Sequence, residues 1–92
     1  MKVNFYATYR PIVGGKTIDF DVDHGITIRQ LVDEIITRFP AMQREMLDDN
    51  GGLYSHVHIF VNGRDSVLLE QKLDTVLRAD DVLNIFPPVG GG

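Results

Sequence analysis

A stripe of apolar residues at helical spacing is the feature of this sequence that most constrains its fold. The stripe recurs every three or four residues, which places its members on one face of an α-helix. Its members are Ile28, Leu31, Val32, Ile35, Ile36 and Phe39. Thr27 can cap the start of this helix, and Pro40 should end it at Phe39. An amphipathic helix must bury its apolar face, so the remaining segments have to supply a surface for it.

The segments before this helix predict two β-strands. Val3, Phe5, Ala7 and Tyr9 alternate with polar residues, until Pro11 and Gly14-Gly15 break the pattern. A second alternating run covers residues 18–22. Two neighbouring runs of this kind predict an antiparallel hairpin with a longer loop than the tightest type.

The segments after the helix predict a short helical turn over residues 41–47 and three further strands. Val57, Ile59 and Val61 alternate and are followed by Asn62-Gly63, a strong signal for a tight turn. We expect a short fourth strand at residues 67–69, a loose helical turn within residues 73–77 and a last strand around Leu83 and Ile85. The polar loop Asp48-Asp49-Asn50-Gly51 predicts a turn, because it lacks the ligand spacing of a calcium loop.

This order of elements predicts one α+β domain with the helix packed across a mixed sheet of four or five strands. A chain of 92 residues is long enough for a single core. We expect residues 1–87 to form this domain and residues 88–92 to form a flexible, glycine-rich C-terminal tail.

Composition excludes several classes of function. Hydrophobic residues make up 43% of the chain without a long apolar run, so we expect no membrane segment or signal peptide, and a cytoplasmic location. The net charge is −4 and the basic residues are scattered, so neither nucleic acid nor a membrane is an expected partner. Since the chain has no cysteine, it has no thiol nucleophile and no thiolate metal site.

The last seven residues suggest where the chemistry lies. The chain ends in Phe86-Pro87-Pro88-Val89-Gly90-Gly91-Gly92. Proline lacks an N–H group and ends a strand, whereas glycine loses the most backbone freedom when it is ordered. Gly90 and Gly91 suit a backbone that threads through a narrow opening, with the α-carboxylate of Gly92 as the reactive group. The alternative is an unstructured end without a function.

The order of elements and several short motifs resemble the ubiquitin-like β-grasp fold. Within it, the chain resembles the MoaD/ThiS family of sulfur carriers, which includes the small subunit of molybdopterin synthase. The resemblance rests on four segments: residues 3–7 with Arg10, Val61-Asn62-Gly63, Asp80-Asp81-Val82 and the Pro-Pro-Val-Gly-Gly-Gly ending. It covers nearly the whole chain.

This resemblance implies a carrier protein that is not itself an enzyme and that binds no cofactor or metal. An E1-like partner would use ATP to adenylate the carboxylate of Gly92, which would become a thiocarboxylate. The thiocarboxylate would then donate sulfur, with a larger synthase subunit, in molybdopterin biosynthesis. Gly90 stands where that branch often has alanine, and residues 41–55 form a longer segment, so thiamine, cysteine and tRNA thiolation stay open as pathways. Two further functions fit the same fold: conjugation to lysines as a ubiquitin-like modifier, and a plain interaction module.

A candidate docking patch lies near the start of the tail. Phe60 and Phe86 are out of phase with Ile59 and Ile85, so we expect them on the outer face of the sheet, together with Tyr6 and His58. With Pro87, Pro88 and Val89, these two phenylalanines are the predicted partner-binding residues; alternatively, another element covers them. His56 and His58 share one face of a predicted strand, but without a third ligand we expect solvated histidines.

Overall fold

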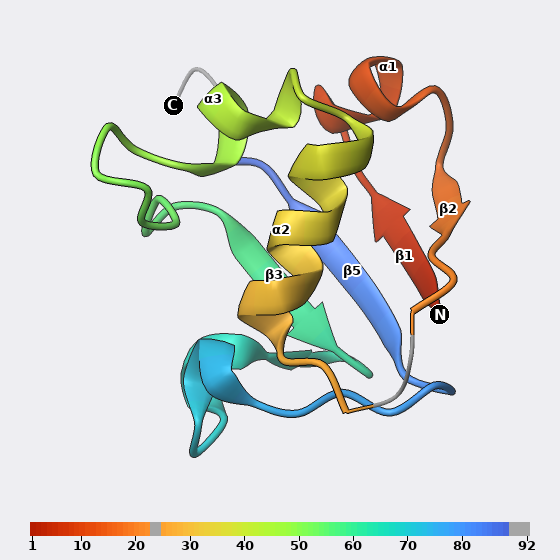
Figure 1. The fold of residues 1–92 in the computed structure, drawn as a ribbon, viewed down its shortest axis with the longest axis vertical. Coiled ribbons are helices and arrows are strands. Elements are labelled where there is room, and N and C mark those ends of the chain that lie inside the picture. Colours follow the sequence, from red (N-terminus) through yellow and green to blue (C-terminus); the bar gives the residue numbers. More distant parts are fainter. Residues whose placement is uncertain (23–24, 89–92) are drawn as a thin grey trace.

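The main helix, α2 (Ile28–Arg38), lies across one face of a five-stranded sheet, as Figure 1 shows. The structure is a computed structural model that describes residues 1–22 and 25–88. Thr27 and Gln30 form a reciprocal capping box at the start of α2. Its buried side chains are Ile28, Leu31, Val32 and Ile35, which confirms the predicted amphipathic helix.

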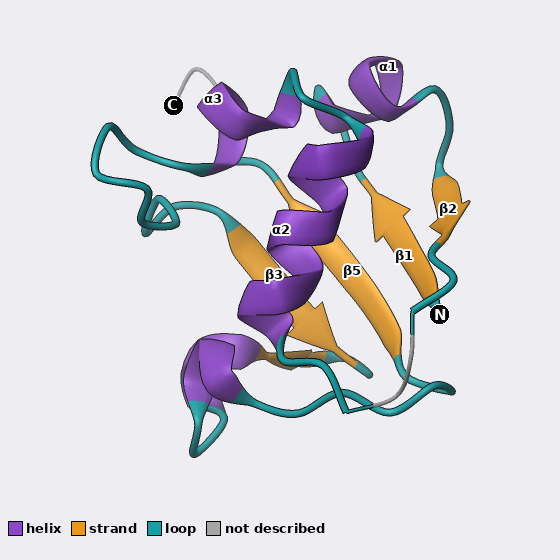
Figure 2. Ribbon diagram, in the orientation of Figure 1, coloured by secondary structure: helices purple, strands orange, loops and turns teal. Residues whose placement is uncertain are grey.

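The sheet is mixed and has the order β2-β1-β5-β3-β4. Its strands are β1 (Lys2–Phe5), β2 (Thr17–Asp19), β3 (His58–Val61), β4 (Arg64–Asp65) and β5 (Val82–Phe86). β1 and β5 are parallel, and the other neighbours are antiparallel. Figure 2 shows β5 between β1 and β3, so the strand that leads to the tail is central. The predicted antiparallel pairing of the first two strands is confirmed, but the second strand is Thr17–Asp19 rather than residues 18–22, and a short helix lies in the connection.

The first strand is shorter than the alternation predicted. β1 ends at Phe5, and residues Tyr9–Val13 form the short helix α1. Ala7 turns the chain with a φ of +50°. Pro11 fits into α1 because it lies in the first turn. The backbone N–H groups of a first turn have no acceptor within the helix, so the missing N–H of proline costs no helical hydrogen bond. Tyr9 is nevertheless buried, so alternation correctly predicted an inward side chain but not a strand.

The fourth strand lies earlier than predicted. Asn62 and Gly63 have φ values of +51° and +86°, as a tight two-residue turn requires, so pairing resumes at once with β4. Asp65 then accepts a hydrogen bond from the N–H of Val67 and starts the 3₁₀ helix η1 (Ser66–Leu68). The prediction of a strand at residues 67–69 was therefore wrong.

The remaining elements follow the predictions more closely. α3 (Met42–Met46) forms the short helix after Pro40. The 3₁₀ helix η2 (Lys72–Asp74) includes only the beginning of the predicted loose turn. Asp48 accepts hydrogen bonds from the N–H groups of Asn50 and Gly52, which confirms a turn in that loop. Residues 89–92 lie outside the described residues, so the predicted tail and the domain boundary at residue 87 stay predictions.

Candidate functional site: a groove at the end of the central strand

The outer face of the sheet carries exposed aromatic side chains because of the register of β3 and β5. Ile59 pairs with Ile85, and both side chains are buried on the side of the sheet that α2 covers. Side chains alternate along a strand, so Phe60 and Phe86 point to the opposite face. Both are partly exposed, which confirms the predicted phase.

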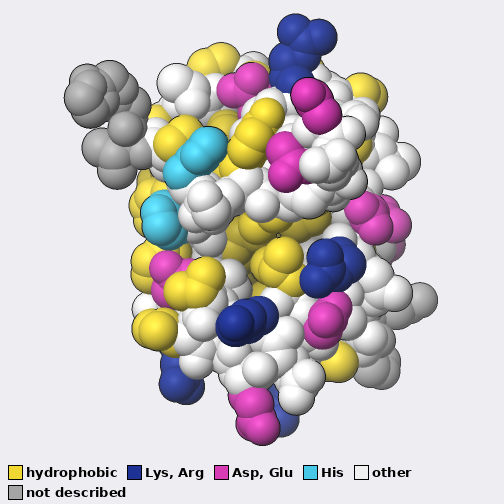
Figure 3. Space-filling view, turned by 90° about the vertical axis from the view of Figure 1, so that its left-hand side faces the viewer, with side chains coloured by type: hydrophobic (Ala, Val, Ile, Leu, Met, Phe, Trp, Pro, Cys, Tyr) yellow, Lys and Arg dark blue, Asp and Glu magenta, His cyan; other side chains and the backbone are white. Residues whose placement is uncertain are grey.

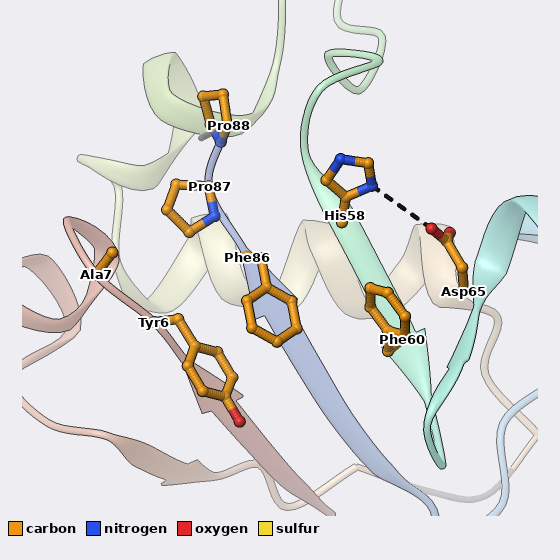
Figure 4. Close-up of a pocket in the computed structure, with 8 residues that line it drawn as sticks. All are labelled: Tyr6, Ala7, His58, Phe60, Asp65, Phe86, Pro87 and Pro88. Atoms are coloured by element: carbon orange, nitrogen blue, oxygen red, sulfur yellow. Dashed lines mark ion pairs between the residues drawn. The ribbon is translucent and has the colours of Figure 1, made fainter. Parts of the chain in front are cut away.

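These aromatic side chains form part of an open groove with a volume of about 580 Å³ (Figure 4). The residues that line it are Tyr6, Ala7, His58, Phe60, Asp65, Phe86, Pro87 and Pro88. They come from the segment that directly follows β1, from β3 and β4, and from β5 with its continuation. The groove therefore includes the first residues beyond the central strand.

Three aromatic rings lie side by side: Tyr6 directly after β1, Phe86 at the end of β5 and Phe60 in β3. The rings of Tyr6 and Phe86 are stacked, with centroids 4.1 Å apart and an interplanar angle of 15°. Phe60 meets Phe86 edge to face, with centroids 5.5 Å apart. The guanidinium of Arg10 lies 5.2 Å from the centroid of the Tyr6 ring. These contacts fix the rings in place without removing them from solvent.

Hydrogen bonds hold the Tyr6 end of this row of aromatic rings. The hydroxyl of Tyr6 donates a hydrogen bond of 2.8 Å to Oδ1 of Asn84, which also accepts one of 3.0 Å from Nδ2 of Asn4. Thr17 donates to Oδ1 of Asn4 at 2.6 Å. The position of the Tyr6 ring is thus set by hydrogen bonds as well as by stacking.

The opposite rim of the groove carries an acidic and a basic group. Nδ1 of His58 lies 3.5 Å from Oδ2 of Asp65, shown as a dashed line in Figure 4. The side chain of Asp65 is 18% exposed, whereas that of His58 is 46% exposed. His56 stacks on Tyr54 with ring centroids 4.9 Å apart and does not line the groove. Within residues 1–22 and 25–88, no group of three or more potential ligands is placed to hold a metal ion.

The structure brings together four of the predicted partner-binding residues, namely Phe60, Phe86, Pro87 and Pro88. Tyr6 and His58, named with them, lie in the same groove. Val89, Gly90, Gly91 and Gly92 lie outside the described residues, so their predicted roles stay predictions.

Two residues of the groove, Ala7 and Asp65, were not predicted from the sequence. The signal for Asp65 was present, because a two-residue turn at Asn62-Gly63 places it opposite Phe60. Placing the fourth strand at residues 67–69 hid this pairing.

The surface has no strongly charged face in the view of Figure 3. Lysine and arginine side chains are interspersed with acidic ones there, and hydrophobic side chains lie beside histidine side chains along one margin. In the described part of the chain, no helix is long and apolar enough to cross a membrane.

Comparisons with known proteins agree with this architecture. The ThiS family model matches residues 3–92. Small archaeal modifier proteins 1 and 3 of Haloferax volcanii are each 32% identical to this chain over 92 residues. These alignments cover all of this chain, 100% of modifier protein 1 and 98% of modifier protein 3. The crystal structure of the first of these aligns with a TM-score of 0.86 at 30% identity, over 99% of this chain and 97% of that one.

A putative molybdopterin converting factor, subunit 1, from Pyrococcus furiosus aligns with a TM-score of 0.72 at 29% identity, covering 96% of this chain and 95% of that one. These similarities confirm the β-grasp fold that the resemblance implied. The chain belongs to the ThiS family, whose members are small ubiquitin-like carrier and modifier proteins.

Proposed function

We propose that this protein is a sulfur carrier whose reactive group is the α-carboxylate of Gly92. The observation that carries the proposal is the position of the groove. Pro87 and Pro88 are walls of the groove and also the first residues of the segment that leads to Gly90, Gly91 and Gly92. A partner seated in the groove therefore contacts the base of the tail and determines the direction in which it leaves the domain.

The length of the tail suits delivery into a partner's active site. Four residues follow Pro88, and an extended chain of that length reaches at most roughly 13–14 Å. Three glycines add no side chains to this segment, so it can pass through a narrow channel. Val89 is the single tail side chain beyond the prolines that a partner could hold.

The carboxylate needs activation from outside, because an α-carboxylate is ionised at neutral pH and is a poor electrophile. In the proposed reaction an E1-like partner binds ATP, and a carboxylate oxygen of Gly92 attacks the α-phosphorus and releases pyrophosphate. The resulting acyl adenylate is attacked by a hydrosulfide equivalent, AMP leaves, and a thiocarboxylate remains. In these proposed reaction steps the protein contributes no cofactor and acts only as the carrier.

We take molybdopterin biosynthesis as the receiving pathway, with a larger synthase subunit as the second partner. The thiocarboxylate sulfur would attack the substrate held by that subunit and form a thioester, and hydrolysis of this thioester by water would leave the sulfur on the substrate and restore the carboxylate of Gly92. Support comes from the similarity to the putative molybdopterin converting factor subunit. Thiamine, cysteine and tRNA thiolation use the same chemistry of the tail and differ in the acceptor.

The second candidate function is protein modification. It is favoured by the identity of 32% with small archaeal modifier proteins 1 and 3. In this case a lysine amine, rather than a sulfur nucleophile, attacks the adenylate of Gly92 and forms an isopeptide bond. The two functions share the activated carboxylate and the docking surface.

Intact-mass analysis of the protein purified from its native host distinguishes the two candidates. Replacement of one oxygen by sulfur at the C-terminus supports the carrier, and a ladder of heavier conjugates supports the modifier. The mass measurement is repeated on protein purified from cells that lack the receiving synthase. The thiocarboxylate should accumulate in these cells.

Removal of Gly92 tests the shared step. We expect the shortened chain to fold with the same unfolding midpoint as the parent, because it loses no residue of the core, and to lose its activity in the pathway. A shortened chain that supports the pathway at the full rate would contradict both functions.

A further inference from the structure

The carboxylate of Asp65 is an unusual wall for an apolar groove. Its oxygen Oδ1 accepts a hydrogen bond of 3.1 Å from the N–H of Val67, which fixes the side chain at the start of η1. Pairing of Phe60 with Asp65 across β3 and β4 places this carboxylate beside the Phe60 ring. Figure 4 shows both side chains at the same side of the groove.

Among the described residues, no permanently charged cation lies beside the other carboxylate oxygen of Asp65. Oδ2 lies 3.5 Å from Nδ1 of His58, and this contact is an ion pair only while the imidazole is protonated. No lysine or arginine within residues 1–22 and 25–88 forms an ion pair with Asp65. Since the side chain is only 18% exposed, an apolar partner that covered the groove would bury a carboxylate without a fixed opposite charge. Such burial is strongly unfavourable.

We infer that the partner seats an arginine side chain against Asp65, beside an apolar side chain that fills the rest of the groove. Arginine fits better than lysine, because its planar guanidinium can pair with a carboxylate and stack on an aromatic face at the same time. Asp65 and the adjacent Phe60 offer both contacts. The net charge of −4 also favours a basic partner surface.

This inference rests on the proposed function, since it describes the protein that the carrier meets. It adds the chemistry of that protein's surface: a partner with an exposed arginine flanked by aliphatic or aromatic side chains. Asp65 would then select partners, because a partner with an acidic or purely apolar surface leaves its charge uncompensated.

Titration of the isotope-labelled full chain with a small probe tests the inference directly by NMR. Phenylguanidinium carries the charged group of arginine on an apolar ring, and phenylurea is its neutral isostere. At low salt we expect both to shift the backbone signals of Phe60, Asp65 and Phe86. Phenylguanidinium should bind roughly two- to fivefold more tightly, as expected for a partly exposed ion pair.

Two matched variants locate the effect. Asp65→Asn retains an oxygen that can accept the Val67 N–H, so the domain should stay folded, and it should bind the two probes equally. Asp33→Asn removes the same charge from the exposed side of α2, on the other face of the sheet, and should retain the preference for phenylguanidinium. Equal affinities in the parent, or a preference that survives Asp65→Asn, would overturn the inference.

The outcome is independent of the tail chemistry. The titration needs neither ATP nor an activated Gly92, so equal binding of the two probes leaves the carrier function standing. Conversely, a dispensable Gly92 would contradict the proposed function but would not change the preference of the groove.

Discussion

At the scale of single residues, the hydroxyl of Tyr9 is a polar group held inside the core. The side chain is 1% exposed, and among the described residues its hydroxyl has no hydrogen-bond partner. Burial, with a further contribution from the negative charge of Glu45, raises the pKa of Tyr9 from 10.0 to about 12. The ring fills the core beneath α1, whereas the hydroxyl contributes little to stability at neutral pH.

We predict that the protein loses stability above about pH 10 in a way that depends on Tyr9. Below pH 10 the hydroxyl is protonated in both states. Between about pH 10 and 12 the unfolded chain releases the proton and the folded chain keeps it, so the free energy of unfolding falls. This contribution reaches about 2–3 kcal/mol. Urea unfolding at several pH values measures it.

Tyr9→Phe should remove this part of the pH dependence and change the free energy of unfolding at neutral pH by less than about 1 kcal/mol. Tyr54→Phe is the control, since it removes a hydroxyl from a half-buried ring and leaves Tyr9 intact. If Tyr9→Phe and the parent lose stability with the same slope, another group is responsible.

At the scale of elements, α2 is held at its start by side chains as well as by packing. Oγ1 of Thr27 accepts the N–H of Gln30 at 3.1 Å, and Oε1 of Gln30 accepts the N–H of Thr27 at 2.8 Å. Two backbone donors that a helix leaves unpaired are satisfied in this way. The backbone of Thr27 also bridges to Val76, so this cap ties the helix to the segment before β5.

We predict that Thr27→Ala lowers the free energy of unfolding by about 1 kcal/mol, because the N–H of Gln30 loses its acceptor. Thr37→Ala makes the same chemical change at an exposed position inside α2 and should have a much smaller effect. Chemical denaturation of both variants gives the comparison. Equal losses at the two positions would show that the cap has no special role.

At the scale of the whole molecule, β5 joins the core to the groove. Its inward side chains, Leu83 and Ile85, are fully buried, and its outward Phe86 lies between Tyr6 and Phe60. The same strand continues into Pro87 and Pro88. The segment that leads to the tail is therefore attached to a central strand, which pairs with β1 on one side and β3 on the other.

We predict that Phe60→Asp weakens the binding of the adenylating partner while the domain stays folded. The substitution places a second carboxylate beside Asp65 in the groove but leaves the buried face of β3 unchanged. Val76→Asp is the control, because Val76 is 60% exposed, pairs with Thr27 before α2 and does not line the groove. Calorimetric titration with the purified partner measures both, and unchanged affinity in Phe60→Asp would remove the groove from the docking surface.

The sequence by itself determined the elements whose signals are local. The stripe from Ile28 to Phe39 specified α2 with its cap and its buried face, and the alternation around Ile59 and Ile85 specified which side of two strands is buried. Because side chains on a strand alternate, that phase also placed Phe60 and Phe86 outside before any pairing was known.

Only the tertiary structure decided how the groove is built. Tyr6, Phe60 and Phe86 become neighbours through the parallel pairing of β1 with β5 and the antiparallel pairing of β5 with β3, and such long-range pairing leaves no mark in any one segment. Asp65 lies in the groove because a positive φ at both Asn62 and Gly63 returns the chain immediately into β4, whereas the sequence pattern had predicted that strand at residues 67–69. Local patterns determine to which face of the sheet a side chain points. The register between distant strands determines which side chains become its neighbours there.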